Sequence, residues 1–369
     1  MSAQELRALL AAQCTRYPGL TAKDLVKALY QATLGCGHFV PDETRAADYL
    51  REEADSLPGN ATGAPLTEML GPRFCRVHLA PYRESGASLS TLARLFALSA
   101  RADVDGGRDA LFEGLDVLEA MAQAGELPLD AADVRAYLAQ YRAAGCPSVH
   151  HSDAFRARYA PAYRVVERRY ADCLPLLARI DRLLGEKPRV LVAIDGMSAS
   201  GKSTLAALLS QVYGAPVIHM DDFFLQPYQR TPERYATPGE NVDHERFAQE
   251  VLGPLVRGGA FAYRPFLCQS FTFGEPVRVE PARLTVVEGS YSLHPALAQA
   301  YDLRVLLRLD PQTQSERILR RNGEAMHARF MQTWVPLENA YFVATDIDAR
   351  CGLRAMTARD GSVSWEDMR

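Results

Sequence analysis

The sequence is 369 residues long, 48% hydrophobic and 23% charged, with a formal net charge of −4. This length is enough for two domains that each bury a core. A mildly acidic chain argues against general nucleic-acid binding, which usually shows as a basic domain. It leaves room for a small anionic ligand held by a few local arginines.

The seven cysteines are scattered along the chain and form no CxxC pair. An odd number of scattered cysteines is typical of reduced thiols, so we expect a cytoplasmic protein. The N-terminus lacks the basic start and apolar run of a signal peptide. We expect no membrane association either, because no apolar stretch approaches the roughly 20 residues of a membrane span.

The first half, residues 1–165, is predicted to form a mainly helical domain of unknown role. Thr21 is a candidate N-cap for a helix that ends near Gly35. A short alternating strand is predicted within 73–82. Further helices are predicted over 41–57, 88–100, 109–125 and 130–145, followed by a long helical stretch over 160–187 whose part 166–187 forms a linker to the second domain.

Two polar features of this half carry no recognisable motif. The spacing of one set of histidines and cysteines matches no short metal motif, so we expect these histidines to be packed or to cap helices. The set consists of His38, His78, His150 and His151, with Cys36 and Cys75. The other is a basic segment, which either approaches an anionic substrate or, as we favour, is the solvated face of a helix: Arg156, Arg158, Arg164, Arg168 and Arg169.

The pattern changes at Pro188, where we place the start of the second domain, residues 188–369. Four apolar runs read as buried strands, over 189–195, 215–220, 284–289 and 303–310. Strands that alternate with helices form a parallel sheet covered on both faces. The predicted fold class is therefore α/β, with a doubly wound, mostly parallel sheet.

The segment GMSASGKST, residues 196–204, follows the first of these strands and opens a predicted helix. Its glycines allow the backbone to curl so that successive N–H groups point at phosphate oxygens, and the helix N-terminus adds a partial positive charge. Lys202 would reach the β- and γ-phosphates and the Ser203 hydroxyl would bind Mg²⁺. The expected nucleotide-binding residues are Gly196, Ser198, Ala199, Ser200, Gly201, Lys202, Ser203 and Thr204.

Five further segments occur in a fixed order after this loop: HMDDFFLQP, NVDHERF, YRPF, VVEGSYS and RILRRN. An Asn-Lys-x-Asp segment, which a regulatory GTPase would use to read guanine, does not occur. Over about residues 186–350 the chain resembles the uridine kinase and phosphoribulokinase-like family of P-loop kinases. This resemblance implies phosphoryl transfer from ATP, with Mg²⁺, to a hydroxyl group.

The resemblance also implies residue roles. Asp221 corresponds to the aspartate that takes the proton of the attacking hydroxyl, and it would help to organise Mg²⁺ together with Glu288. Asp243 and Tyr263 fall at substrate positions, where the family binds sugar hydroxyls and stacks on the substrate. The lid helix supplies arginines that stabilise the transferred phosphoryl group: Arg317, Arg320 and Arg321.

Each role has a structural alternative. Asp221 could cap a turn, Asp243 could be a helix N-cap, and Glu288 could be a solvated strand end. Tyr263 could be an ordinary core aromatic. The three arginines recur at helical spacing and could form a salt-bridged surface.

The sequence departs from uridine kinases at Cys268, where they carry a base-reading histidine five residues after the stacking tyrosine. We therefore predict a kinase for a small hydroxyl-bearing metabolite and leave the acceptor open. The alternatives are a genuine uridine or cytidine kinase and a nucleotide-binding regulator that phosphorylates no metabolite. The choice between ATP and GTP, and whether the chain forms a homo-oligomer, also stay open.

Overall fold

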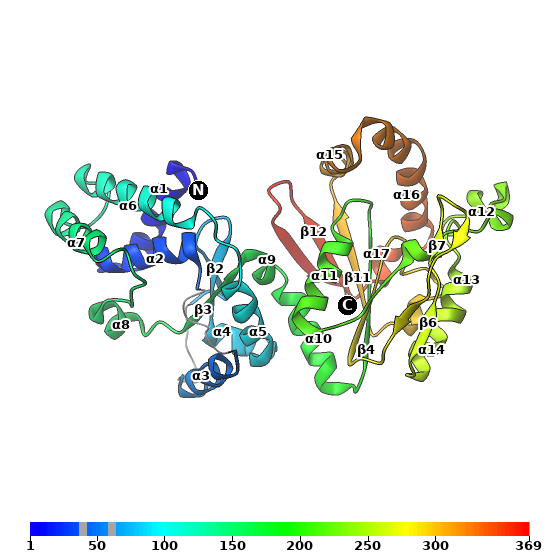
Figure 1. The fold of residues 1–369 in the computed structure, drawn as a ribbon, viewed down its shortest axis with the longest axis horizontal. Coiled ribbons are helices and arrows are strands. Elements are labelled where there is room, and N and C mark those ends of the chain that lie inside the picture. Colours follow the sequence, from blue (N-terminus) through cyan, green and yellow to red (C-terminus); the bar gives the residue numbers. More distant parts are fainter. Residues whose placement is uncertain (37–42, 58–63, 369) are drawn as a thin grey trace. The chain divides into compact units, whose positions relative to one another are not determined.

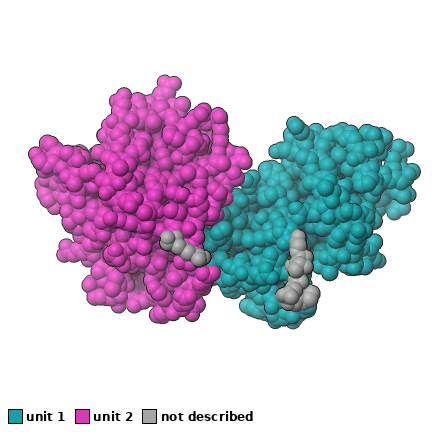
Figure 2. All heavy atoms as spheres, turned by 180° about the vertical axis from the view of Figure 1, so that it is seen from behind, with its two compact units in different colours: residues 1–178 teal, residues 179–369 magenta. Residues whose placement is uncertain are grey.

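A computed structural model describes residues 1–36, 43–57 and 64–368. The chain divides into two compact units, Met1–Ala178 and Arg179–Arg369, coloured teal and magenta in Figure 2. Within the described ranges, no helix is both long and apolar enough to cross a membrane. Each unit has its own buried hydrophobic cluster, so each is described by itself.

The first unit is mainly helical and also holds a small antiparallel sheet in the order β1-β2-β3. Its core is formed largely by leucines of α1, α2 and α6. Its helices are α1 (Ala3–Arg16), α2 (Ala22–Leu34), α3 (Glu43–Ser56), α4 (Leu79–Glu84), α5 (Leu89–Ala100), α6 (Gly107–Gln123), α7 (Ala131–Ala143), α8 (Asp153–Tyr159) and α9 (Arg168–Ala171), and its strands are β1 (Thr67–Met69), β2 (Phe74–His78) and β3 (Tyr163–Glu167).

The prediction of one helical stretch over 160–187 is wrong at its start, because Tyr163–Glu167 forms strand β3. This strand pairs antiparallel with all of β2, and its register joins Phe74 to Glu167 and His78 to Tyr163. Two adjacent valines and a tyrosine favour an extended backbone that packs against a neighbouring strand. Helix returns at α9 and at α10 (Leu174–Glu186), which contains the division between the two units.

The second unit contains a six-stranded sheet in the order β13-β12-β11-β4-β10-β5. All pairings are parallel except that of β13, which runs antiparallel to β12 at the edge. Helices cover both faces, with α11 on one face and α13 and α14 on the other (Figure 1). The predicted α/β class is therefore confirmed, and the four predicted strands correspond to β4, β5, β10 and β11.

The strands of the main sheet are β4 (Val190–Gly196), β5 (Val217–His219), β10 (Leu284–Glu288), β11 (Leu303–Leu309), β12 (Leu353–Thr357) and β13 (Val363–Asp367). The helices are α11 (Lys202–Tyr213), α12 (Pro232–Ala236), α13 (His244–Phe247), α14 (Gly253–Arg257), α15 (Pro311–Arg329), α16 (Val335–Ala344) and α17 (Ile347–Arg350). Two small antiparallel sheets pair β6 (Phe261–Tyr263) with β9 (Val277–Val279) and β7 (Phe266–Leu267) with β8 (Thr272–Phe273).

The parallel register gathers polar groups at one edge of this sheet. Glu288, the last residue of β10, lies opposite Ile194 of β4 and His219 of β5. The loop 196–204 leaves β4 at the same edge and turns directly into α11. The carboxyl ends of parallel strands are where ligands bind in open α/β sheets, so the fold places the candidate site here.

Candidate functional site

The loop between β4 and α11 has a backbone that only glycine adopts easily at two points. Gly196 has φ of +146° and Gly201 has φ of +98°. A Cβ at Gly196 would lie 2.3 Å from the Leu307 carbonyl oxygen on the neighbouring strand β11, whereas a Cβ at Gly201 would meet nothing within 4 Å. The first glycine therefore serves strand packing as well as the curl of the loop, and the second serves the curl alone.

Lys202 and Ser203 begin α11 and point to different partners. The Lys202 ammonium donates to the carbonyl oxygens of Gly196 and Met197, at 2.8 and 3.0 Å, and so spans its own loop. The Ser203 hydroxyl donates to Glu288 at 3.1 Å. His219 Nδ1 also lies 2.6 Å from the Glu288 carboxylate, and this hydrogen bond raises the pKa of His219.

Asp221 lies in a 3-10 turn, Met220–Phe223, directly after β5. Its side chain is accessible, yet partial desolvation by the surrounding protein raises its pKa, with Glu288 adding to the rise and Lys202 opposing it. The structure thus brings together four of the predicted residues: Lys202, Ser203, Asp221 and Glu288. A hydroxyl and carboxylates are hard oxygen ligands of the kind Mg²⁺ prefers, so this group fits such an ion.

A buried carboxylate that was not predicted from the sequence supports the loop where it leaves β4. Asp195 is fully buried and accepts hydrogen bonds from the backbone N–H groups of Gly196, Tyr291 and Leu293, and from the Tyr341 hydroxyl. Burial raises its pKa to about 6, while these donors oppose the rise. The sequence feature that could have predicted this role is the position of Asp195 at the end of an apolar strand, immediately before the first loop glycine.

A second unpredicted carboxylate, Glu338 of α16, holds the loop from the side. It accepts from the Ser198 N–H at 2.9 Å, from the Ser198 hydroxyl at 2.6 Å and from the Ser290 hydroxyl at 2.8 Å. Its exposed fraction is only 4%. Glu338 therefore ties three separate segments together: the loop, the turn after β10 and the helix α16.

The three predicted lid arginines lie on α15 and do not converge. The Arg317 guanidinium approaches the Ala199 carbonyl oxygen of the loop at 3.5 Å. Arg320 and Arg321 are exposed, and Arg321 donates to Asn322 beside it. Among the contacts of the described residues, Arg317 is the one of these three arginines that contacts the loop. Gly323 interrupts the helical backbone of α15 just beyond them.

The two predicted substrate residues are buried and bonded within the protein. Asp243 is 2% exposed, caps α13 by accepting from the Arg246 N–H at 3.1 Å, and lies 3.5 Å from the Arg246 guanidinium. Tyr263 is buried beside Phe223, and its hydroxyl donates to Asp222 at 2.9 Å. The structural alternatives are therefore observed, a helix N-cap for Asp243 and a core aromatic for Tyr263. The predicted substrate contacts of both residues stay predictions.

Three ligand-type side chains in this unit lie close together, with donor atoms within 4.8 Å of one another: Glu240, His244 and His294. The Ala296 N–H donates to Nδ1 of His294, so in the neutral ring Nε2 carries the proton. That nitrogen then faces Glu240 at 3.6 Å as a donor and has no lone pair for a metal. Desolvation lowers the pKa of His294 to about 4, which keeps this ring neutral.

Two of the histidines singled out in the first half, His78 and His151, bond to acidic or aromatic partners. His78 Nε2 lies 3.1 Å from Glu68, and His151 lies between Asp24 and Tyr163. His38 lies outside the described residues. The expected packing of histidines in this half is therefore observed for His78 and His151.

Comparison with known proteins gives structural matches only. No protein-family model matches the sequence, and no curated protein matches it. A protein described as a possible uridine kinase from Bacillus stearothermophilus is 22% identical, with 48% of this chain and 98% of that chain covered and a TM-score of 0.35. A candidate fructose transport system kinase from Silicibacter sp. TM1040 is 27% identical, with 46% and 93% covered and a TM-score of 0.36.

The strand order, the parallel pairing and the glycine-lysine loop at the end of β4 define the second unit as a P-loop domain built on a mostly parallel α/β sheet. Each of the two solved structures is similar to about half of this chain. The α/β fold predicted for the C-terminal half is confirmed by the strand order and pairing of the structure itself.

Proposed function

We propose that this protein is an Mg²⁺-dependent kinase that transfers the γ-phosphoryl group of ATP to a hydroxyl of a small metabolite. The observation that carries the proposal is the position of Asp221 beside Lys202, Ser203 and Glu288 at one sheet edge. A switch protein has little need of a carboxylate there, whereas phosphoryl transfer uses one as a base. The acceptor is proposed only as a class, because Asp243 and Tyr263 are bonded internally.

In this mechanism the loop N–H groups and Lys202 bind and orient the phosphates. Ser203 and Glu288 would hold Mg²⁺, which neutralises charge on the phosphates when it is bound. Asp221 takes the proton from the acceptor hydroxyl, and its raised pKa suits a base that works near neutral pH. Arg317, whose guanidinium lies 3.5 Å from the Ala199 carbonyl oxygen of the loop, would stabilise the transferred group.

The first experiment is a screen of nucleosides, sugars and vitamin precursors for acceptor-dependent ADP release by the purified protein with ATP and Mg²⁺. Stimulation by one acceptor supports a kinase, and uridine or cytidine would identify the nucleoside kinase alternative. Cys268, which replaces the base-reading histidine, lies 3.5 Å from the Arg230 guanidinium. A nucleoside acceptor would point to these two residues as the altered base-reading surface.

The mechanism is then tested at two adjacent carboxylates. Asp221→Asn should lower turnover by roughly 10²–10⁴-fold with little change in ATP affinity, because it removes the base and leaves the loop, Lys202 and Ser203 in place. Asp222→Asn is the matched control, because an amide oxygen can still accept from Tyr263 and activity should stay within a few-fold of the original. A fully active Asp221→Asn protein would overturn the assignment of Asp221 as the base, whereas a wild-type protein that no acceptor stimulates would favour the nucleotide-binding regulator.

A further inference from the structure

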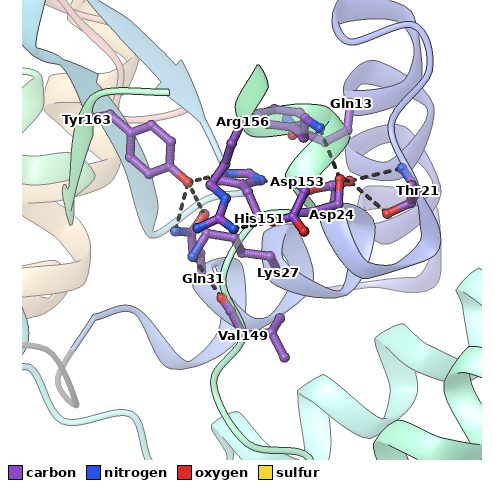
Figure 3. Close-up of polar contacts among 12 residues, drawn as sticks. Gln13, Thr21, Asp24, Lys27, Gln31, Val149, His151, Asp153, Arg156 and Tyr163 are labelled. Atoms are coloured by element: carbon purple, nitrogen blue, oxygen red, sulfur yellow. Dashed lines mark hydrogen bonds and ion pairs between the residues drawn. The ribbon is translucent and has the colours of Figure 1, made fainter. Parts of the chain in front are cut away.

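The first unit contains a cavity of about 410 Å³, well separated in sequence from the P-loop. It lies among α2, α3, α5, α8 and β3, and Figure 3 shows several of the side chains around it. A volume of this size is in the range of small-molecule sites. The lining residues that carry the argument are aromatic or cationic: Tyr49, Phe96, His151 and Tyr163, with Lys27, Arg156 and Arg164.

One wall is a hydrogen-bonded chain that joins Asp24, His151 and Tyr163 (Figure 3). His151 Nδ1 lies 3.0 Å from Asp24 Oδ1 and His151 Nε2 lies 2.7 Å from the Tyr163 hydroxyl. The donors around Asp24 hold its pKa well below the usual range, so it is a carboxylate and the Nδ1–H donates to it. The Tyr163 O–H therefore donates to Nε2, and the wall is fixed by satisfied polar contacts.

The same tyrosine is anchored from a second direction. The Gln31 side-chain N–H donates to the Tyr163 hydroxyl at 3.2 Å, and the Gln31 carbonyl accepts from the buried Arg76. The Arg76 guanidinium also lies 4.8 Å from the centre of the Tyr163 ring. A rigid, preformed wall of this kind lowers the entropic cost of ligand binding.

The residues that line the cavity are predominantly positive: Lys27, Arg156 and Arg164, against a single lining carboxylate, Glu53, which pairs with Arg164 at 2.7 Å. Arg156 also pairs with Asp153, which does not line the cavity, and the Lys27 ammonium donates to the Val149 carbonyl oxygen at 2.9 Å. Lys27 is 8% exposed, and desolvation with help from nearby Arg76 lowers its pKa to about 8, although Asp24 opposes the shift. A bound anion would relieve the cost of this buried cation.

We propose that this cavity binds a small organic anion, a carboxylate or phosphate monoester with a planar aromatic body. The anionic group lies against Lys27 and Arg156, and the aromatic body lies among Tyr49, Phe96 and Tyr163. The site is independent of the proposed kinase chemistry. It also revises the expectation for the basic segment, since Arg156 and Arg164 line a cavity that Arg158 does not.

The test is titration calorimetry of the full chain with phenyl phosphate, inorganic phosphate and benzyl alcohol. Phenyl phosphate should bind with a stoichiometry of one, and the other two probes should bind more weakly. Near pH 8 binding should take up protons, seen as heats that depend on the buffer, because the anion raises the pKa of Lys27. Equal binding of inorganic phosphate, or no binding of phenyl phosphate, would overturn the proposal.

Three variants localise the site. Arg156→Met and Lys27→Met should each raise the Kd for phenyl phosphate by about tenfold, the usual size of a lost hydrogen bond to a charged group. Arg158→Met is the matched control on the same helix and should change nothing. Because Arg156 is 56% exposed, its variant tests the site even if Lys27→Met fails to fold. Binding abolished by Lys202→Ala but kept in Arg156→Met would place the anion at the P-loop instead.

Discussion

The two glycines of the P-loop give the sharpest structural prediction, because both have positive φ and only Gly196 is also crowded by a neighbouring strand. Both have positive φ, but only at Gly196 would a methyl group collide with another strand, at 2.3 Å from the Leu307 oxygen and 2.9 Å from its nitrogen. Gly196→Ala must therefore push β4 and β11 apart. Gly201→Ala only has to adopt an unfavourable backbone angle.

The expected costs differ accordingly. At Gly201 the backbone strain amounts to about 1–2 kcal/mol. At Gly196 a strain of about 1–3 kcal/mol adds to an overpacking cost of about 1–3 kcal/mol, giving about 4 kcal/mol. For a unit of this size the central values, about 1.5 and about 4 kcal/mol, correspond to a fall in Tm of roughly 3–6 °C for Gly201→Ala and roughly 8–16 °C for Gly196→Ala.

Differential scanning calorimetry of both variants measures these shifts, and ATP titration shows whether the loop still binds phosphate. Gly201→Ala should keep the fold and weaken ATP binding, since the curl of the loop is disturbed where α11 begins. The Gly196→Ala substitution should mainly lower Tm. If the Gly196→Ala protein were as stable as the Gly201→Ala protein, the Leu307 carbonyl of β11 would not be what requires a glycine at position 196.

Three further predictions follow from named contacts. Lys202→Ala should weaken triphosphate binding and abolish transfer in titration and turnover assays, and full activity would show that this loop is not the ATP site. The hydrogen bond to Glu288 raises the pKa of His219, so its contribution to the free energy of unfolding is present below about pH 6.5 and is lost as the pH rises. Urea unfolding of His219→Gln should lack this pH dependence. Arg76→Met leaves the buried Glu68 without its 2.8 Å partner and should cost roughly 3–5 kcal/mol in urea unfolding, whereas unchanged stability would contradict the pairing.

The parts of this molecule that could be predicted are those encoded by short, continuous patterns. The apolar run ending at residue 195 and the spacing of Gly196, Gly201 and Lys202 are local, and they led to the sheet edge and the phosphate loop. Ser203 followed from the same spacing, and the roles of Asp221 and Glu288 followed from the resemblance to the kinase family, with both carboxylates at or just after a strand end. In a parallel sheet all such ends meet at one edge.

The residues that were missed depend on contacts between distant segments. Glu338 lies 140 positions from Ser198, on a helix whose sequence carries no phosphate motif. Strand β3 was missed because its basic and apolar residues also fit a helical period, and only its pairing with β2 decides in favour of a strand. The chain from Asp24 to Tyr163 likewise joins α2, the segment before α8 and β3.

The contacts of the loop also imply how it must change when a triphosphate binds. Lys202 already bonds two loop carbonyls and the Ser198 N–H already bonds Glu338, so phosphate oxygens exchange these contacts rather than add to them. The Glu338 carboxylate also places a negative charge beside an anion site. Glu338→Gln keeps an acceptor for the Ser198 N–H, and the serine hydroxyls can rotate to accept from the new amide.

This variant therefore removes charge while it preserves the contacts. We expect ATP to bind roughly three- to tenfold more tightly to Glu338→Gln, with the larger gain at low salt, because the repulsion is electrostatic and is screened by ions. Titrations at two salt concentrations measure both effects, and an unchanged Tm shows that the loop is intact. Weaker ATP binding by a variant of unchanged Tm would mean that the carboxylate positions the loop for phosphate instead of opposing it.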